Sequence, residues 1–224
     1  MKKFVRDNSL SIFFLALFLL ALGFQSLAGW QDFNNAQLRH HGEAIGYGRY
    51  LVSSEFGVAM LENWQSEYLQ FTLYVVATVW FLQRGSPESK ELDQPGPESD
   101  EEQKVGRHAD ADSPRWAGAG GLRASLYSNS LLIVMGAIWV LSWLGQSITG
   151  RVAYNEERIE HMQGALSYGE YLGSADFWER TLQNWQSEFL AVGSMAILAV
   201  YLRQRGSPES KPVGAAHEHT GVTG

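Results

Sequence analysis

Two glutamates are the residues of this sequence best placed to do chemistry. Glu67 and Glu188 each end a string Asn-Trp-Gln-Ser-Glu, at 63–67 and 184–188, and an apolar run follows each string. A carboxyl group removed from water inside such a run is a candidate site for a proton or a cation. The alternative is structural: Asn63 and Asn184 cap a helix, and the acid complements the positive end of its dipole. The depth of the two carboxylates decides between these interpretations.

Other polar and aromatic side chains are expected beside the glutamates. Gln25 and Gln146 lie near the outer ends of two further apolar runs. We expect Gln25 to bond to the turn 63–67 and Gln146 to its counterpart, each bond contributing about 0.6–2 kcal/mol. Trp64 and Trp185 are expected to anchor helices at a membrane surface, where amphipathic rings settle.

These residues recur because the chain contains an internal repeat. Residues 6–90 align without gaps with residues 127–211, and about 34 of the 85 aligned positions are identical. Both copies end in Gln-Arg-Gly-Ser-Pro-Glu-Ser-Lys, at 83–90 and 204–211. Glycine and proline explain the end of a helix there, but not the Glu-Ser-Lys that follows. Binding of the basic residues to anionic headgroups and binding of a cytoplasmic protein partner remain open for this motif.

The elements that position these residues are four apolar runs. Residues 9–29 carry no charge and, as a helix, span about 30 Å, the thickness of a bilayer's hydrocarbon core. The basic start and apolar run also resemble a signal peptide. Because the segment recurs at 131–150, inside the chain, we interpret it as a retained membrane anchor. Residues 64–82 and 185–202 are the other two predicted spans.

The segments before and after these two spans carry helix-boundary signals. Ser53 and Ser174 are N-cap candidates for helices that start near residues 54 and 175. We expect these helices to lie at the outer interface or to run on into the spans. Each span is predicted to end with an arginine in its last turn and a glycine just beyond, at Arg84–Gly85 and Arg205–Gly206.

The domain organisation follows from the repeat. Residues 1–90 form a first two-span hairpin and residues 125–211 a second. Residues 91–124 are rich in acids, proline and glycine, and we predict a disordered linker. Residues 212–224 are predicted to be a disordered tail.

Basic residues predict the orientation. Of the 17 lysines and arginines, only Arg39, Arg49, Arg151, Arg158 and Arg180 lie on the side opposite the termini and linker. Basic residues concentrate on the cytoplasmic side of membrane proteins. Both termini and the linker are therefore predicted to be cytoplasmic. The two hairpins then insert the same way up, as parallel repeats.

Composition excludes several classes of function. The chain has no cysteine, which excludes disulfides, thiolate catalysis and cysteine-ligated metals. Its net charge of −7 argues against nucleic-acid binding. His40 and His161 have acids nearby but no metal-ligand spacing, so we expect solvated histidines and no metal site. Phosphate loops, dinucleotide fingerprints and nucleophile elbows are absent. We expect no cofactor and no enzyme activity.

The strings Tyr-Gly-x-Tyr-Leu (47–51 and 168–172), Asn-Trp-Gln-Ser-Glu and Gln-Arg-Gly-Ser-Pro-Glu-Ser-Lys carry a resemblance. They resemble an uncharacterised family of bacterial membrane proteins catalogued as a domain of unknown function. This resemblance implies a bacterial integral membrane protein and supplies no activity.

The sequence thus predicts an all-α fold, a four-helix transmembrane bundle of two tandem hairpins with interfacial helices on the outer side. The two Asn-Trp-Gln-Ser-Glu turns are expected to face each other across a pseudo-two-fold axis. As function we expect a scaffold or interaction module of the bacterial inner membrane. The alternative is a small proton- or cation-coupled transporter or channel subunit that uses Glu67 and Glu188. Expected partners are the lipid bilayer and a second copy of the chain or another membrane protein.

Overall fold

The chain folds into helices joined by loops. The computed structural model describes residues 2–222, so residues 1, 223 and 224, at the ends of the predicted first hairpin and tail, lie outside the described residues. Between residues 2 and 222 there are helices and no strands, which confirms the predicted all-α class. The long helices are α2 (Ser9–Arg39), α4 (Ser54–Trp80), α6 (Ser130–Glu160) and α8 (Ala175–Tyr201), and the short ones are α1 (Lys2–Asp7), α3 (Tyr47–Tyr50), the 3-10 turn η1 (Gly106–His108), α5 (Gly121–Ser128) and α7 (Tyr168–Leu172).

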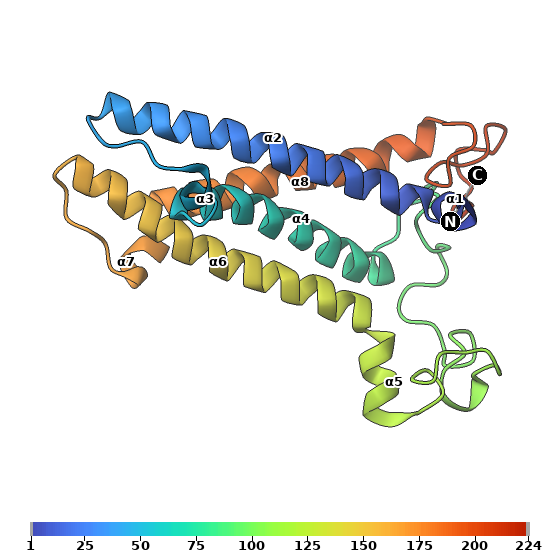
Figure 1. Cartoon of the computed structure of the whole chain (residues 1–224). Coiled ribbons are helices and arrows are strands. Elements are labelled where there is room, and N and C mark those ends of the chain that lie inside the picture. Colours follow the sequence, from blue (N-terminus) through green and yellow to red (C-terminus); the bar gives the residue numbers. More distant parts are fainter. Residues whose placement is uncertain (1, 223–224) are drawn as a thin grey trace.

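The four long helices lie side by side and alternate in direction. Both termini and the segment between α4 and α5 lie at one end, and α3 and α7 lie at the other (Figure 1). Between Trp80 and Gly121 the only regular element is η1. The predicted disorder of the linker and of the tail stays a prediction.

The aligned halves of the chain form matching helices. α2 and α6 are each 31 residues long, and α4 and α8 are each 27 residues long. The predicted N-caps are confirmed: Ser53 accepts a hydrogen bond from the backbone N–H of Phe56, and Ser174 accepts one from Phe177. α4 and α8 each continue unbroken from these caps. Of the two placements predicted for residues 54–62, the continuous helix is correct.

Two of the long helices have the length and hydropathy needed to cross a membrane. They are α2, with a mean hydropathy of 2.2 over its most apolar stretch, and α6, with 1.8. α4 and α8 do not reach this standard, because each carries the polar string Asn-Trp-Gln-Ser-Glu near its middle.

The closest packing in the bundle is between α4 and α6, and α4 also packs against α8. Glycines allow this approach. A β-carbon placed on Gly57 of α4 would lie 2.8 Å from Cγ2 of Thr149, and one placed on Gly145 of α6 would lie 2.8 Å from Cδ1 of Leu61. Small residues at helix interfaces let backbones come close enough for extensive contact.

The predicted pseudo-two-fold relation does not hold for this packing. α2 and α8 are the counterparts of α6 and α4, but they do not pack together in the same way. α8 has Trp178 where α4 has Gly57, and α2 has Phe24 where α6 has Gly145. α2 and α8 therefore lack the glycines that allow the close approach of α4 and α6. α2 meets the other long helices only through scattered side chains, and a cavity of about 110 Å³ separates it from α4.

The outer loops explain the repeated Tyr-Gly-x-Tyr string. The first tyrosine bonds to a serine of the preceding long helix: the Tyr47 hydroxyl lies 2.7 Å from Ser26 Oγ. The counterpart pair, Tyr168 and Ser147, is 2.6 Å apart. The second tyrosine packs on a glycine, since a β-carbon on Gly29 would clash with the Tyr50 hydroxyl. The string therefore folds each outer loop back onto its helix.

The inner loops correct the predicted helix ends. α4 ends at Trp80 and α8 at Tyr201, so Arg84 and Arg205 lie beyond the last turn. The chain turns earlier because Phe81 is extended and side chains of the motif fold the loop. Gly85 adopts the expected positive φ of 82° within that loop.

The serine and lysine of the motif have structural tasks. Ser89 Oγ accepts the backbone N–H of Gln83, and its counterpart Ser210 accepts that of Gln204. The lysines bind backbone carbonyl groups: Lys90 that of Gly96, and Lys211 those of residues 216, 217 and 219. These bonds explain why the motif contains a serine and a lysine. They do not explain its glutamate.

Candidate functional site

The two Asn-Trp-Gln-Ser-Glu strings meet inside the bundle, at the seam between α4 and α8. The indole N–H of Trp185 donates to Oε1 of Gln65 at 2.7 Å, and Gln65 is fully buried. The hydroxyl of Ser66 donates to Oε1 of Glu188 at 3.4 Å. Glu67 and Glu188 are close enough for their charges to interact. The seam therefore gathers carboxylates from both halves of the chain.

This meeting is asymmetric. Trp64, the counterpart of Trp185, lies 6.3 Å from the ring of Phe18 and makes no hydrogen bond with Gln186. Gln186 is exposed, whereas its counterpart Gln65 is buried. Trp185 is half-buried, and Gln65 supplies the partner that its indole N–H needs. Trp64 is 36% exposed. The predicted role of Trp64 and Trp185 as interfacial anchors stays a prediction.

The asparagines of the strings do not cap helices. Asn63 and Asn184 lie ten residues or so inside α4 and α8, and each donates to the carbonyl four residues earlier, at 2.8 Å in both cases. The helices are capped at Ser53 and Ser174 instead. Glu67 therefore does not lie at a helix N-terminus, and the dipole explanation for it fails.

The register between α4 and α6 gives the level of Glu67. Gly57 faces Thr149, Leu61 faces Gly145, and Thr72 faces Gly136. Glu67 lies between the last two of these levels, so it is level with the middle of the apolar part of α6, residues 131–150. Glu188 lies at the same level, because it accepts the bond from Ser66. Both carboxylates lie far from either end of the bundle.

Gln25 and Gln146 do not bond as predicted. The buried Gln146 donates to Thr181 Oγ1 at 3.5 Å, one turn away from the turn 184–188. Its Oε1 is buried and has no partner among the described residues. Gln25 borders the small cavity between α2 and α4 together with Asn63 and Trp64. The prediction fails because α2 lies apart from α4, and because Thr181 is nearer to Gln146 than the turn is.

A network of charges lies on the outer side of the glutamates. Arg180 of α8 bonds to Asp176 on its own helix at 3.0 Å and to Glu62 of α4 at 3.5 Å. Arg180 is replaced by Ala59 at the equivalent position of the first half, so the repeat gives no signal for it. On the inner side, Gln70 and Tyr74 continue the same face of α4, spaced four residues apart with Glu62 and Ser66. The polar face thus runs through the bundle.

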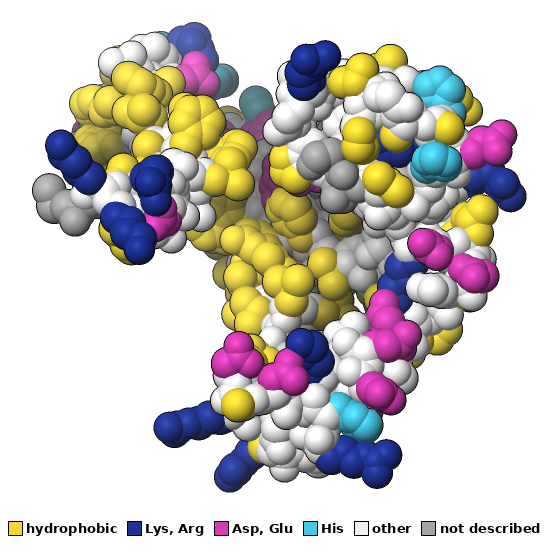
Figure 2. Space-filling view, turned by 90° about the vertical axis from the view of Figure 1, so that its right-hand side faces the viewer, with side chains coloured by type: hydrophobic (Ala, Val, Ile, Leu, Met, Phe, Trp, Pro, Cys, Tyr) yellow, Lys and Arg dark blue, Asp and Glu magenta, His cyan; other side chains and the backbone are white. Residues whose placement is uncertain are grey.

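The polar face ends at the inner loops. The hydroxyl of Tyr74 donates to Glu88, the glutamate of the first Pro-Glu-Ser-Lys motif. Glu209, the equivalent residue of the second motif, lies beside Glu88, and both line one cavity with Gln70 and Tyr74. Viewed from this end, Lys and Arg side chains lie around the outer edge of the molecule, and hydrophobic side chains line the hollow at its centre (Figure 2).

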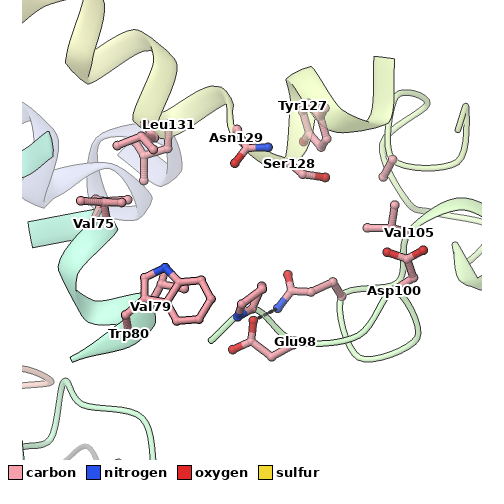
Figure 3. Close-up of a pocket in the computed structure, with 15 residues that line it drawn as sticks. Val75, Val79, Trp80, Glu98, Asp100, Val105, Tyr127, Ser128, Asn129 and Leu131 are labelled. Atoms are coloured by element: carbon pink, nitrogen blue, oxygen red, sulfur yellow. Dashed lines mark hydrogen bonds between the residues drawn. The ribbon is translucent and has the colours of Figure 1, made fainter. Parts of the chain in front are cut away.

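A second, larger cavity of about 630 Å³ lies between the inner ends of α4 and α6 and the linker. The helices supply an apolar wall that includes Val75, Val79 and Leu131, and the linker supplies Glu98 and Asp100 (Figure 3). Lys90 forms a 2.5 Å ion pair with Glu98. A hydrogen bond from Lys90 lowers the pKa of Glu98. Glu98 is already paired with Lys90 and is not free to bind a ligand. We therefore interpret this cavity as the place where the linker packs against α4 and α6.

The bond between Trp185 and Gln65 yields a testable prediction. We expect Gln65→Leu to lower the stability of the protein by about 1–2 kcal/mol, because the half-buried indole N–H of Trp185 loses its partner. Thermal unfolding in detergent measures the effect. Gln186→Leu is the matched control, because the equivalent glutamine is exposed. If both variants lost the same stability, the bond between Trp185 and Gln65 would not contribute specifically to the fold.

Comparison with known proteins gives a family but no activity. A search of curated proteins and a search of solved structures each return no match to the chain. A family model described as "Domain of unknown function (DUF6766)" matches residues 1–222. The chain belongs to this family.

Proposed function

We propose that this protein is a four-span membrane protein that carries protons or small cations along the polar seam between α4 and α8, with Glu67 and Glu188 as the central binding groups. The observation that carries the proposal is their level in the bundle, at the middle of the apolar part of α6. A charged side chain at a bilayer centre costs about 2.5–3.5 kcal/mol, and such residues typically mark ion or proton pathways.

The dimensions of the helices support four spans. α4 and α8 have 27 residues each and are about 40 Å long, enough to cross the hydrocarbon core. Gln65 and Ser66 of α4 and Thr181 of α8 are buried against the other helices, and these polar residues lower the mean hydropathy of α4 and α8. Both termini and the linker lie at one end of the bundle, as an even number of spans requires (Figure 1).

The same arrangement supports the predicted location. The end with the termini and linker carries all but five of the 17 lysines and arginines. Under the positive-inside rule, this distribution supports our proposal that this end is cytoplasmic and that the chain lies in a bacterial inner membrane. The lipid bilayer is then the main partner of the exposed apolar faces. No enzyme activity is proposed.

The polar groups on either side of the glutamates support a path. Glu62 and Arg180 lie toward the outer end, and Gln70, Tyr74 and Glu88 lead to the inner end. Protons can pass along chains of carboxyl, hydroxyl and amide groups linked by water. Four helices enclose little space, so protons or small cations suit this seam better than larger solutes.

A scaffold or interaction module is the second candidate function, and the exposure of Glu67 favours it. Glu67 is exposed on the surface of the bundle, although it lies at mid-level. A basic side chain of a second copy or of another membrane protein could pair with it there, because ionised groups in a membrane are usually paired. In that case the seam would assemble a complex and would carry no flux.

Proton flux into proteoliposomes tests the proposal. Purified protein is reconstituted into vesicles that contain a pH-sensitive dye, and valinomycin with a potassium gradient sets the membrane potential. We expect acidification well above that of protein-free vesicles prepared in the same way. If neither a proton gradient nor a sodium gradient is dissipated faster than in protein-free vesicles, the transport proposal is wrong, and the scaffold remains.

A further inference from the structure

The glutamates of the two Pro-Glu-Ser-Lys motifs form part of one cavity. Glu88 follows α4 and Glu209 follows α8, and the fold brings these equivalent residues together at the inner end of the bundle. The cavity has a volume of about 410 Å³. Helix termination explains neither glutamate, and the serine and lysine beside each have other tasks in the loops.

We propose that this cavity binds a small organic cation, such as a protonated primary amine, between Glu88 and Glu209. The inference extends the proposed function, because it names a class of ligand at the inner end of the same seam. The site lies apart from the central glutamates, so the two proposals can be tested separately.

The polar groups that line the cavity select a cation. Glu88 and Glu209 contribute carboxyl oxygens, and the hydroxyl of Tyr74 donates to Glu88, which leaves its lone pairs free to accept. Oε1 of Gln70, an acceptor, is buried and has no partner among the described residues. No lysine or arginine lines the cavity. An ammonium group has three donors and a positive charge, and it can satisfy these acceptors.

The remaining walls favour an organic ligand over a metal ion. Phe71 of α4 and Ala191, Val192 and Met195 of α8 supply the apolar part of the cavity lining. The volume lies in the range of small-molecule sites, which are mostly apolar with a few placed polar groups. Calcium needs six to eight oxygen ligands, and the residues that the structure describes contain no group of three His, Cys, Asp or Glu side chains suited to a metal. Phe71 can also face a bound ammonium group.

Binding at this site is coupled to protons. A hydrogen bond with Glu88 and the charge of that residue raise the pKa of Glu209, so Glu209 takes up a proton more readily than an isolated glutamate does. The groups that face the pair are Tyr74 from α4 and apolar side chains from α8, while Lys90 and Lys211 bind backbone carbonyls. A cation between the carboxylates competes with a proton on Glu209. Affinity is therefore expected to rise with pH, and binding releases a proton.

Calorimetric titration of the purified full chain in detergent with n-butylammonium chloride tests the inference. We expect saturable binding at about pH 8, binding about ten-fold weaker at about pH 5, and no competition by sodium chloride or by n-butanol. The variant E88Q/E209Q should bind at least about ten-fold more weakly than the wild type. Val192→Phe, which narrows the cavity without changing its charge, should also weaken binding.

Matched variants make the test decisive. E91Q/E218Q removes two exposed glutamates next to the same loops and should bind like the wild type. E67Q/E188Q should also keep its affinity for butylammonium while proton flux is lost, which separates the two proposals. Helical circular dichroism identifies any variant that fails to fold, and V192F then carries the test. The inference is overturned if the wild type shows no saturable binding, or if E88Q/E209Q or V192F, folded, binds as tightly as the wild type.

Discussion

The double variant E67Q/E188Q is expected to reduce proton flux in proteoliposomes by at least about ten-fold, with insertion into the membrane unchanged. Glutamine keeps the shape of glutamate and its hydrogen bond with Ser66, but it cannot take up and release a proton. Both carboxylates lie at the middle level of the bundle, where the proposed path needs groups that can exchange a proton. The initial rate of dye quenching at a fixed membrane potential measures the loss.

The control for this variant removes two glutamates elsewhere. Glu43 and Glu160 lie exposed in and before the outer loops, and E43Q/E160Q changes the net charge by the same amount. We expect it to keep most of the wild-type flux. Equal flux in E67Q/E188Q and the wild type would remove the two glutamates from the mechanism, and equal losses in the two variants would point to an effect of net charge.

The second large effect is expected at the contact between α4 and α6. Replacing Gly145 by phenylalanine, the residue at the equivalent position of α2, places a β-carbon 2.8 Å from Leu61. Gly57→Trp, which copies α8, places one 2.8 Å from Thr149. Each change should destabilise the bundle by about 1–3 kcal/mol, because overpacking forces the helices apart. The midpoint of thermal unfolding in detergent should fall in each variant and further in the double variant.

Glycines in open surroundings provide the control for this contact. A β-carbon on Gly23 of α2 or Gly193 of α8 would meet nothing within 4 Å. Gly23→Phe and Gly193→Phe are therefore expected to keep the unfolding midpoint close to that of the wild type. A midpoint for Gly145→Phe no lower than theirs would show that the α4–α6 approach is not the main contact of the bundle.

The helices and their caps could be predicted from the sequence because the signals are local. Ser53 and Ser174 fix the starts of α4 and α8, and the repeat predicts matching elements in each half. The C-terminal ends of these helices were harder to predict from the sequence. Gly85 has the positive φ that its position suggests, but α4 stops at Trp80, since Ser89 and the rest of the motif fold the loop before the helix reaches Arg84.

Partners between helices could not be predicted in the same way. The motif pointed to residues 63–67 and 184–188, and the structure brings them together, but with Gln65 and Trp185 as the bonded pair. The repeat suggested equal halves, whereas α4 and α6 have Gly57 and Gly145 at their contact and the equivalent positions hold Trp178 and Phe24. Glu88 and Glu209 share a cavity only because two loops converge, and no spacing along the chain shows that.

The most direct test of four spans is labelling of single cysteines from outside the cell. The chain has no cysteine, so Asp100→Cys in the linker and Glu160→Cys at the end of α6 each give one reactive position. In spheroplasts, a membrane-impermeant maleimide should label position 160 directly and position 100 only after lysis. If only α2 and α6 crossed the membrane, these results would be exchanged. That exchange, or labelling of both positions from the same side, would contradict the placement of Glu67 and Glu188 at the centre of a bilayer.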